Sequence, residues 1–592
     1  MTSILNALDA LARTGFEDLG FPADLGAVSP STRGDAPFQC NGAMGAVGIL
    51  KKRGEKANPR EIAAKIVAAL EGAPQIESLE IAGPGFINIT PTASLVAARA
   101  NALAGDVRTG ALMAADPDTI VIDYGGPNVA KPMHVGHLRS GVIGESLKRL
   151  FRFIGHTVIG DIHLGDWGLQ MGHLITELES EQPNLPYFDA SITEGYSSEP
   201  PVTIDDLSRL YPQASNKAKS DDARMVLSRK ATAELQAGRA GYRALLDHFI
   251  SVSIAALKTD YGKLGVEFDL WKGEAAVDPL IPGMVKDLTA MGITEKSEGA
   301  LIIRVAEEGD KKEIAPVILI SSAGAALYAT TDLATLIDRK SEINPDRIFY
   351  VVDQRQAQHF EQVFRAAVKA GWYKADQLEH LGFGTVNGTD GKPFKTRDGG
   401  ILRLADLMSM ATQAAAKRMA EAGIGAEFDE AEHADIAHKV GIAAIKFADL
   451  QNQRTTNYVF DIDRFTSFEG KTGPYLLYAA VRIKSILCKA KTLGVSAGQI
   501  MPETPSETAL VLALDNFERA LSHCANKRAP HILCDHVYTL AQAFSRFYSE
   551  CPILADTTPD AVKASRLGLA QTVLRQLELG LDILGMNAPE RM

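Results

Sequence analysis

Cysteine is scarce in this sequence of 592 residues, and its five copies are scattered along the chain. They are Cys40, Cys488, Cys524, Cys534 and Cys551. None of them forms a CxxC pair or stands at the Cys/His spacing of a zinc site, and their number is odd. We therefore expect a reducing compartment and no metal held by protein ligands.

Long apolar runs are missing as well. No segment approaches about eighteen uninterrupted apolar residues, and the opening residues MTSILNALDALARTGFED include an early aspartate and no cleavage-like site. A hydrophobic share of 46% and a charged share of 23% are ordinary for a soluble protein. We expect a soluble, cytoplasmic protein without a membrane partner.

An excess of positive charge is also absent, because the formal net charge is −12. A nucleic-acid partner would therefore have to bind to a local patch. Residues 441–592 carry nearly equal numbers of basic and acidic side chains, so the acidic excess lies in the rest of the chain. This comparatively basic end is compatible with RNA binding without requiring it.

The chain is too long for one hydrophobic core, and its length suggests about three or four domains. Residues 1–110 mix helical and strand-like patterns, which predicts an α+β module used for docking, RNA contact or plain structural support. Residues 111–435 alternate strand and helix patterns around an insertion near residues 178–235. Residues 436–592 have helical spacing throughout, which predicts an all-α helix bundle.

Residues 119–168 contain the strongest functional pattern. A β-rich run at 119–123 passes through the turn GGPN into a helical pattern after Pro132, and a second β-rich run follows at 157–162. Strand, helix and strand in this order predict a βαβ unit, with a parallel sheet whose first loop borders a ligand crevice. The predicted fold class is α/β multi-domain, with a Rossmann-like parallel-sheet catalytic domain at its centre.

Three later strand patterns are expected to belong to the same domain. Those at residues 300–305 and 314–321 should bring the chain back to the sheet, and the one at 348–352 reads as a buried strand. Gln356 follows that last strand, at the edge of a parallel sheet where ligands bind. An ordinary polar loop is the alternative there.

The motif HVGH at residues 134–137 falls at the start of the crossover helix. His134 and His137 share one helix face near an N-terminus whose N–H groups and dipole favour bound phosphate. Gly136 between them leaves room for a base or ribose to approach. The imidazoles can donate hydrogen bonds to phosphate oxygens. Taken alone, the motif fits two capping or core histidines equally well.

Two downstream patterns add to this one. Tyr328 and Asp332 are four residues apart, so they face the same way on a helix and suit a cationic substrate. A packed tyrosine and a solvated aspartate are the alternative. The loop GTDGKPFKTRDGG at residues 388–400 holds Lys395 and two more basic residues between glycines. Such a loop can close over a polyphosphate, although most are solvated turns.

With these residues the chain resembles the class I aminoacyl-tRNA synthetases and, within them, the arginyl-tRNA synthetases. HVGH is similar to the HIGH signature, and PNVAKPMHVGHLRS with HLGDWGLQMG is close to the arginine-specific form. LYATTDLA, YVVDQRQAQHF, YVFDIDRFTSFEGKTGPYLLYAAVRIKSIL and GLDILGMNAPERM follow in the same order as in that family. The resemblance covers nearly the whole chain.

The resemblance implies attachment of L-arginine to tRNA(Arg) through an arginyl-adenylate, with ATP and Mg²⁺ as cofactors. It assigns the nucleotide to His134, Gly136 and His137. The arginine-binding positions that it implies are Asp123, Asn128, His137, Tyr328, Asp332 and Gln356. A guanidinium requires a carboxylate, which Asp123 or Asp332 could supply. The choice between the two stays open at this point.

The sequence departs from the family pattern in three places. Gly125 and Gly126 stand where many relatives have two serines, and Asp123 stands where glutamate is common. The family's KMSK signature is absent, since the equivalent loop reads KPFKTRDGG. In relatives of this kind a lysine just upstream of HIGH is thought to compensate. We therefore predict Lys131, counted among the catalytic residues with His134 and His137, and also Lys395 as phosphate contacts.

The resemblance also implies how the other domains bind tRNA. The amino-terminal module would contact the tRNA elbow, and the helical carboxy-terminal domain would bind the anticodon. The predicted RNA-facing residues are Phe468, Tyr475, Tyr478 and Arg482, with both tyrosines available for stacking or else packed. A monomer is the family expectation.

Two rival functions remain open from the sequence. One is a class I synthetase of another specificity, or a small nucleotidyltransferase, because HxGH is shared among them. The other is a catalytically inactive tRNA-binding paralogue, which the missing KMSK and the two glycines favour.

Overall fold

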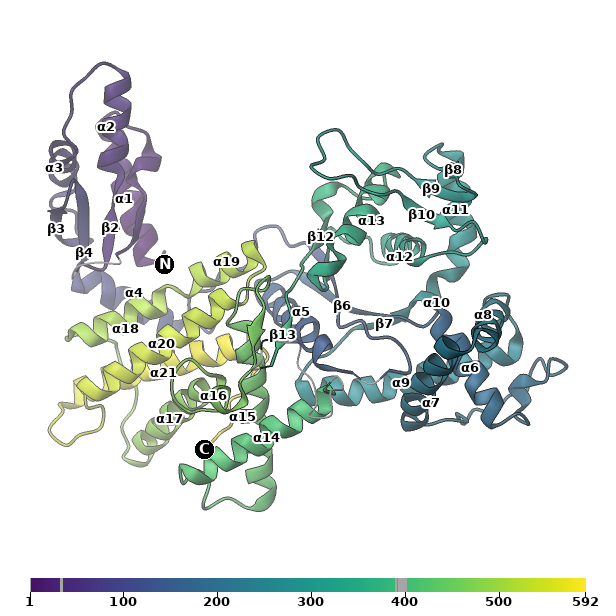
Figure 1. The fold of residues 1–592 in the computed structure, drawn as a ribbon. Helices are drawn as coiled ribbons and strands as arrows, with labels where there is room; N and C mark the ends of the chain where they lie inside the picture. Colours follow the sequence, from purple (N-terminus) through teal and green to yellow (C-terminus); the bar gives the residue numbers. More distant parts are fainter. Residues whose placement is uncertain (1, 32–35, 132, 389–390, 392–401) are drawn as a thin grey trace.

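The computed structural model of the chain describes residues 2–31, 36–131, 133–388, 391 and 402–592. Figure 1 shows an amino-terminal module standing on a helical carboxy-terminal domain, beside a central parallel sheet with helices around it. In the described ranges no helix is long and apolar enough to cross a membrane.

The amino-terminal module is a four-stranded antiparallel sheet in the order β1-β2-β4-β3 with helices packed against it. The strands β1 and β2 are only three residues long, too short for a clear sequence pattern. Helix α3 starts at Pro59, and the side chain of Asn58 before it accepts a hydrogen bond from Arg60 N. The elements are α1 (Ile4–Asp18), β1 (Val28–Pro30), β2 (Phe38–Cys40), α2 (Gly42–Lys52), α3 (Pro59–Leu70), β3 (Ile76–Ala82), β4 (Phe86–Pro91) and α4 (Ala93–Gly105).

The central sheet has five parallel strands in the order β12-β11-β5-β6-β7. The chain runs from β5 to β6 and β7 on one side and later to β11 and β12 on the other. The loops after β5 and β11 therefore diverge, and a crevice opens at the carboxyl ends of these two strands. The bounds are β5 (Thr119–Tyr124), β6 (Thr157–Leu164), β7 (Leu270–Gly273), β11 (Arg347–Val351) and β12 (Leu378–His380).

The expectation that residues 300–305 and 314–321 return to this sheet is wrong. They form β9 (Ala300–Ile303) and β10 (Val317–Ile320), which pair antiparallel in a separate sheet with β8 (Glu295–Ser297). Buried and exposed residues alternate along β10, because only one of its faces packs on helices. A strand of a covered parallel sheet would bury both faces.

Helices cover the sheet and fill the insertion. Those of the insertion lie together beside α9 in Figure 1, away from the lobe that carries β8 to β10. Between α5 (Val135–Phe153) and β11 the chain forms α6 (Leu169–Glu181), α7 (Ile204–Ser220), α8 (Asp222–Gln236), α9 (Ala240–Leu264), α10 (Glu274–Val277), α11 (Ile281–Ala290) and α12 (Tyr328–Glu342), and α13 (Ala357–Lys369) follows β11.

The carboxy-terminal part is helical, and helices begin at Leu404, ahead of residue 436. Its last helix starts at Asp560, after Pro559, without a side-chain cap, and the Thr558 hydroxyl donates a hydrogen bond to Pro552 O at 3.3 Å. A short parallel pair, β13 (Val386–Asn387) with β14 (Tyr458–Val459), connects this part to the sheet domain. The helices are α14 (Leu404–Glu421), α15 (Glu430–Leu450), α16 (Ile462–Phe465), α17 (Gly473–Thr492), α18 (Pro505–Asp515), α19 (Phe517–Lys527), α20 (His531–Glu550) and α21 (Asp560–Ile583).

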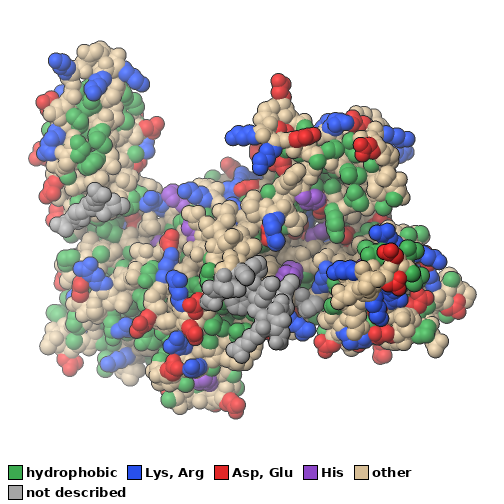
Figure 2. All heavy atoms as spheres, viewed as in Figure 1, with side chains coloured by type: hydrophobic (Ala, Val, Ile, Leu, Met, Phe, Trp, Pro, Cys, Tyr) green, Lys and Arg blue, Asp and Glu red, His purple; other side chains and the backbone are tan. Residues whose placement is uncertain are grey.

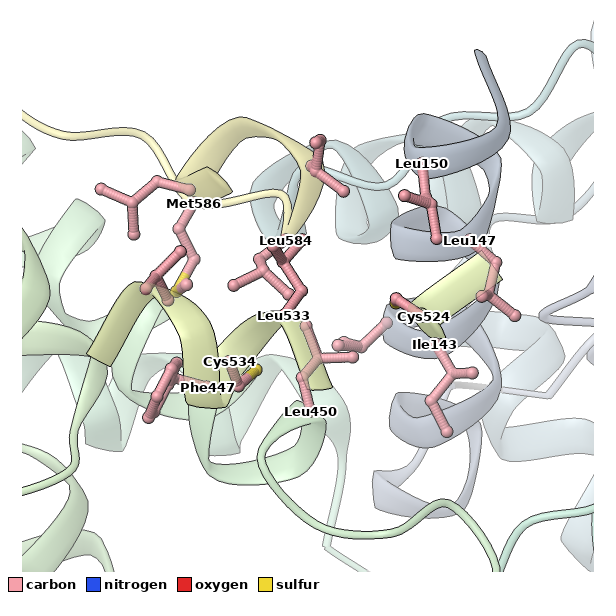
Figure 3. Packing of buried hydrophobic residues seen from close by; sticks show 14 of the residues in the cluster. Ile143, Leu147, Leu150, Phe447, Leu450, Cys524, Leu533, Cys534, Leu584 and Met586 are labelled. Atoms are coloured by element: carbon pink, nitrogen blue, oxygen red, sulfur yellow. The ribbon is translucent and has the colours of Figure 1, made fainter. Parts of the chain in front are cut away.

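Helix α5 (Val135–Phe153) is buried along nearly its whole length. Figure 3 shows Ile143, Leu147 and Leu150 on this helix, which lies beside buried residues of the carboxy-terminal helices in the same hydrophobic cluster. On the sheet side, Gly144 lies against Tyr124 of β5 so closely that a Cβ atom would stand 2.2 Å from the ring. The helix that carries HVGH is thus held between the sheet and the carboxy-terminal helices.

Replacing Gly144 with alanine should destabilise the protein, because the backbone of α5 cannot retreat from Tyr124. We expect a loss of about 1–3 kcal/mol in the free energy of unfolding, measured by urea denaturation. Gly262→Ala is the matched control. That glycine lies in α9, and apart from its chain neighbours and the backbone of its own helix no atom lies within 4 Å of the position that a methyl group would take, so alanine should add about 0.5–1 kcal/mol to the free energy of unfolding. Equal stability of the two variants would contradict this packing.

Candidate active site

A cavity of about 760 Å³ opens at the carboxyl ends of β5 and β11. Figure 2 shows the surface hollowed between the lobe that carries α11 to α13 and the helices α6 to α8. Most of the predicted arginine and nucleotide residues line the cavity. They are Asp123, Asn128, His134, Gly136, His137, Tyr328, Asp332 and Gln356.

The two predicted lysines do not line this cavity in the described part of the chain. Lys131 lies in the loop between β5 and α5, close enough for its charge to act on both histidines. Lys395 lies outside the described residues. The chain that follows its loop returns beside the motif, because Val135 N donates a hydrogen bond to Leu402 O at 3.1 Å.

The two histidines of HVGH are held as neutral side chains. Their ring centroids are 4.0 Å apart. Burial, and then the positive charge of Lys131, lowers the pKa of His134. Burial, and then the charge of His134, lowers the pKa of His137 to about 3. Near neutral pH both imidazoles are therefore uncharged.

Hydrogen bonds to the backbone decide which ring nitrogen carries the proton. Gly136 N donates to His134 Nδ1 at 3.0 Å, and His134 N donates to His137 Nδ1 at 3.1 Å. A neutral imidazole that accepts at Nδ1 must carry its hydrogen on Nε2. Each ring therefore has an Nε2–H donor left for an anion.

The N–H groups at the start of α5 are not free, contrary to the sequence expectation. Gly136 N is used by His134, His137 N donates to His134 O at 2.8 Å, and Val135 N donates to Leu402 O. A phosphate at this helix end would meet the imidazole donors and the helix dipole rather than the backbone. Packing also explains why position 136 is a glycine, since a Cβ atom there would stand 2.6 Å from the His134 ring.

The packing of the turn explains why glycine occupies positions 125 and 126. Gly125 has a φ of +80°, and a Cβ there would meet the Tyr261 hydroxyl at 2.7 Å. A Cβ on Gly126 would lie 2.6 Å from His163 O. Serine would be strained at the first position and would clash at the second. The departure from the family's two serines is therefore matched to the packing of this turn.

Asp123 is already engaged by a side chain of the protein. Arg339 Nη2 lies 2.6 Å from Asp123 Oδ2 and 2.6 Å from Asp161 Oδ2, and all three residues are buried. Burial raises the pKa of Asp123, while Arg339 partly offsets this effect. The Asp123 carboxylate thus lines the cavity, and the guanidinium of Arg339 largely balances its charge.

Helix α12 brings Tyr328 and Asp332 to the cavity on one face, as their spacing predicted. Asp332 Oδ2 lies 2.5 Å from His359 Nε2, and the carboxylate keeps 22% of its surface exposed. Tyr328 is 69% exposed at the cavity mouth. Asn128 and Gln356 add neutral amide groups to the lining.

Glu274 is a cavity residue that the sequence reasoning missed. It opens α10 directly after β7, and Asp166 of the GDWG turn holds this start by accepting from Ala275 N at 2.8 Å. Burial, followed by the charges of Asp166 and Asp332, raises the pKa of Glu274 to about 8. Its position directly after a strand of the parallel sheet was the available signal.

The predicted RNA-facing residues lie on and beside α17. Tyr478 is 39% exposed, with the Phe468 ring 6.3 Å away. Tyr475 packs against Tyr538, and the Arg482 guanidinium lies over the Tyr548 ring at 4.3 Å. Tyr478 is the aromatic ring of this set that offers most surface.

The sequence matches known domain families along most of its length. Residues 99–462 match the family described as tRNA synthetases class I (R), catalytic domain. Residues 476–592 match the DALR anticodon binding domain, and residues 2–90 match the arginyl tRNA synthetase N terminal domain. Fold and site together thus define a class I aminoacyl-tRNA synthetase.

Curated relatives align with the whole chain. An arginine–tRNA ligase of Maricaulis maris (strain MCS10) is 63% identical over 594 residues, covering 100% of both chains. One of Alkaliphilus oremlandii (strain OhILAs) is 47% identical over 596 residues, again covering 100% of both. The chain therefore belongs to the arginyl-tRNA synthetase family.

Solved structures share the fold at low identity. The arginyl-tRNA synthetase of Plasmodium falciparum superposes with a TM-score of 0.80 at 22% identity and covers 100% of both chains. That of Thermus thermophilus gives 0.78 at 22% identity, covering 99% of this chain and 100% of its own. The predicted multi-domain α/β fold class is confirmed.

Arg339→Met should destabilise the protein strongly, because two buried carboxyl groups lose their cation. We expect a loss of about 3–5 kcal/mol in the free energy of unfolding by urea denaturation. Arg347→Met is the control. Its ion pair with Asp118, 3.1 Å long and half exposed, lies at the other end of the same sheet. That variant should lose at most about 1 kcal/mol, and a similar loss in both would contradict the role of the buried cluster.

Proposed function

We propose that this protein attaches L-arginine to tRNA(Arg) using ATP, through an arginyl-adenylate, with release of AMP and pyrophosphate. The observation that carries the proposal is that one side of the cavity suits an anion and the other side suits a cation. Two neutral Nε2–H donors face it from α5, and carboxyl groups face it from α10 and α12. Relatives named arginine–tRNA ligase over the full length support the same reaction.

The acidic side of the cavity would bind arginine. We assign the guanidinium to Asp332 and Glu274, because the Asp123 carboxylate is already matched by Arg339. Tyr328 supplies an aromatic wall for the planar cation. Asn128 and Gln356 would hold the α-amino group, and Asp123 adds negative charge nearby.

The histidine side would bind ATP. The Nε2–H groups of His134 and His137 would donate hydrogen bonds to phosphate oxygens. Gly136, which has no side chain, would leave room for the nucleotide at the start of the helix. Lys131 and Lys395 add positive charge. The arginine carboxylate oxygen forms a bond to the α-phosphorus as the bond from that phosphorus to the bridging oxygen breaks, and pyrophosphate leaves. Catalysis rests on positioning and charge, without a covalent enzyme intermediate.

Mg²⁺ would neutralise the phosphate charge when it is bound with ATP. Among the described residues no group of three or more His, Cys, Asp or Glu side chains could hold a metal ion, so the phosphates themselves would be its principal ligands. The residues of the cavity therefore fit a metal that arrives with the nucleotide.

In the second step the terminal ribose hydroxyl of the tRNA attacks the arginyl carbonyl carbon, and AMP leaves. Tyr478, with Phe468, Tyr475 and Arg482 beside it, would meet unpaired bases of the anticodon. The amino-terminal module, residues 1–110, would contact the tRNA elbow. We propose a cytoplasmic monomer with the catalytic domain at 111–435 and the anticodon-binding domain at 436–592.

Arginine-dependent exchange of pyrophosphate into ATP, run with and without tRNA(Arg), tests the function. We expect exchange with arginine and none with other amino acids. Exchange that depends on another amino acid would favour a different synthetase specificity. No exchange under either condition would favour an inactive tRNA-binding paralogue. The two glycines that favoured this alternative in the sequence are explained by the packing of their turn.

Lys131→Ala should slow adenylate formation on the order of 100-fold, because a cation at the developing phosphate charge is lost. The KM for arginine should stay near that of the wild type, since the acidic side of the cavity is untouched. Pyrophosphate exchange measures both parameters. Lys258→Ala removes a lysine that lies over the Trp271 ring at 5.3 Å and should change neither. Wild-type exchange in Lys131→Ala would refute the role of this lysine.

Arginine binding should strengthen as pH rises toward about 8. The raised pKa of Glu274 means that the free protein holds a proton there, which must leave before the carboxylate pairs with the guanidinium. Below about pH 8 the dissociation constant for arginine should rise by up to about tenfold per pH unit.

Calorimetric titration with arginine between about pH 6.5 and about pH 8.5 checks this dependence, because that range spans most of the titration of Glu274. Glu274→Gln should bind arginine more weakly and show a flat profile. Glu518→Gln is the control, because burial also raises the pKa of Glu518, which does not line the cavity. An unchanged slope in Glu274→Gln would contradict the assignment.

A further inference from the structure

The side chain of Lys131 points to the insertion rather than to a carboxylate. Its Nζ lies 4.5 Å from the centroid of the Tyr211 ring, which belongs to α7. The charge of the same ammonium group also acts on His134 and His137. A cation over the face of a tyrosine ring is attracted by the negative charge of that face. The insertion therefore supplies the partner of the lysine beside HVGH.

The backbone beneath Lys131 is held firmly. Ala130, the residue before it, has a φ of +65°, an uncommon value for a residue with a side chain. Ala130 N donates a hydrogen bond to the buried hydroxyl of Ser253 at 3.0 Å, and Lys131 N donates to Asn128 O at 3.4 Å. With the backbone held in this way, the remaining freedom lies in the four-carbon stem of the lysine.

Helix α7 carries Tyr211, with Pro212 following it inside the helix, and is held by its start and by its buried face. Its start is a capping box in which the Thr203 and Asp206 side chains bond each other's backbone N–H groups. One face of the helix is buried against α6, α8 and α9, with Leu207 and Leu210 inside. Tyr211 is half-buried at the edge of this face, so its ring is held while one side remains open to Lys131.

Tyr211 also lies near the arginine side of the cavity. Burial raises the pKa of Tyr328, and the charges of Glu274 and of the Tyr211 phenolate would raise it further. Tyr211 thus contacts Lys131 and lies close enough to Tyr328 for an electrostatic effect. Neither its position in the sequence nor any motif indicated this.

We propose that Tyr211 is a positioning residue for adenylate formation, whose ring holds the Lys131 ammonium beside the paired histidines. The inference rests on the proposed role of Lys131 and assigns the insertion a part in the reaction. Without the ring the lysine stem samples more rotamers, so a smaller share of molecules presents the charge to the phosphate. Tyr211 acts through Lys131 and need not touch a substrate.

Substitutions at Tyr211 test this in pyrophosphate exchange. Tyr211→Phe keeps the ring and should keep the wild-type kcat. Tyr211→Leu should lower kcat by about 3- to 10-fold, the range of a partly exposed cation–π contact, with the KM for arginine unchanged. In a Lys131→Ala background, Tyr211→Leu should cause no further loss, because the group that it positions is gone.

Tyr196→Leu is the matched control within the insertion. Tyr196 stacks on Tyr187 at 5.1 Å and has no contact with Lys131, so its loss should leave exchange unchanged even if the melting temperature falls. A melting curve of each variant separates a folding defect from a kinetic one.

The outcomes distinguish the inference from the function on which it rests. Wild-type kcat in Tyr211→Leu, together with slow exchange in Lys131→Ala, overturns the role of Tyr211 alone. Wild-type exchange in both variants removes the role of Lys131 itself. A Tyr211→Leu loss that persists in the Lys131→Ala background, or that Tyr211→Phe shares, also overturns the inference, because the ring would then act by another route.

Discussion

The burial of helix α5 on both sides is the constraint on which the rest of the structure depends. Its apolar residues complete the core of the sheet domain and that of the carboxy-terminal helices at once. Gly144 allows it to lie directly on Tyr124, and the helix also contacts α15, α19 and α21 of the carboxy-terminal part. A helix held in this way cannot shift without disturbing two domains. His134 and His137 at its start therefore keep their position relative to both the sheet and the domain that would bind tRNA.

Charge around the cavity is arranged by burial as much as by residue type. The same desolvation keeps the two histidines neutral and holds a proton on Glu274, because a low-dielectric site disfavours every charged form. The ion pair with Arg339 partly offsets the desolvation cost of the Asp123 carboxylate. The acidic groups left for a ligand are thus those that face the cavity without an internal arginine, namely Asp332 and, once it has lost its proton, Glu274. This division makes one crevice suitable for a cation and an anion side by side.

Much of the site was predictable because ligand-binding residues of parallel sheets follow strand ends. Asn128, Gln356 and the histidines come directly after β5 or β11, and Tyr328 and Asp332 share a helix face by their spacing. Glu274 obeyed the same rule but followed a strand of only four residues, too short to stand out. The strands β9 and β10 were assigned to the wrong sheet, since a pattern of apolar residues shows that a strand exists and not which neighbour it pairs with.

The amino-acid sequence was enough to identify the family, the order of the domains and the residue types at the proposed nucleotide and arginine positions. These features reside in local motifs and spacing, which survive without knowledge of contacts. How the charges are paired could be learned only from the folded chain: Asp123 pairs with Arg339 from a distant helix, and Lys131 contacts Tyr211 of the insertion. Such pairs join residues far apart in the chain, and their energies depend on burial and distance, which no local pattern contains.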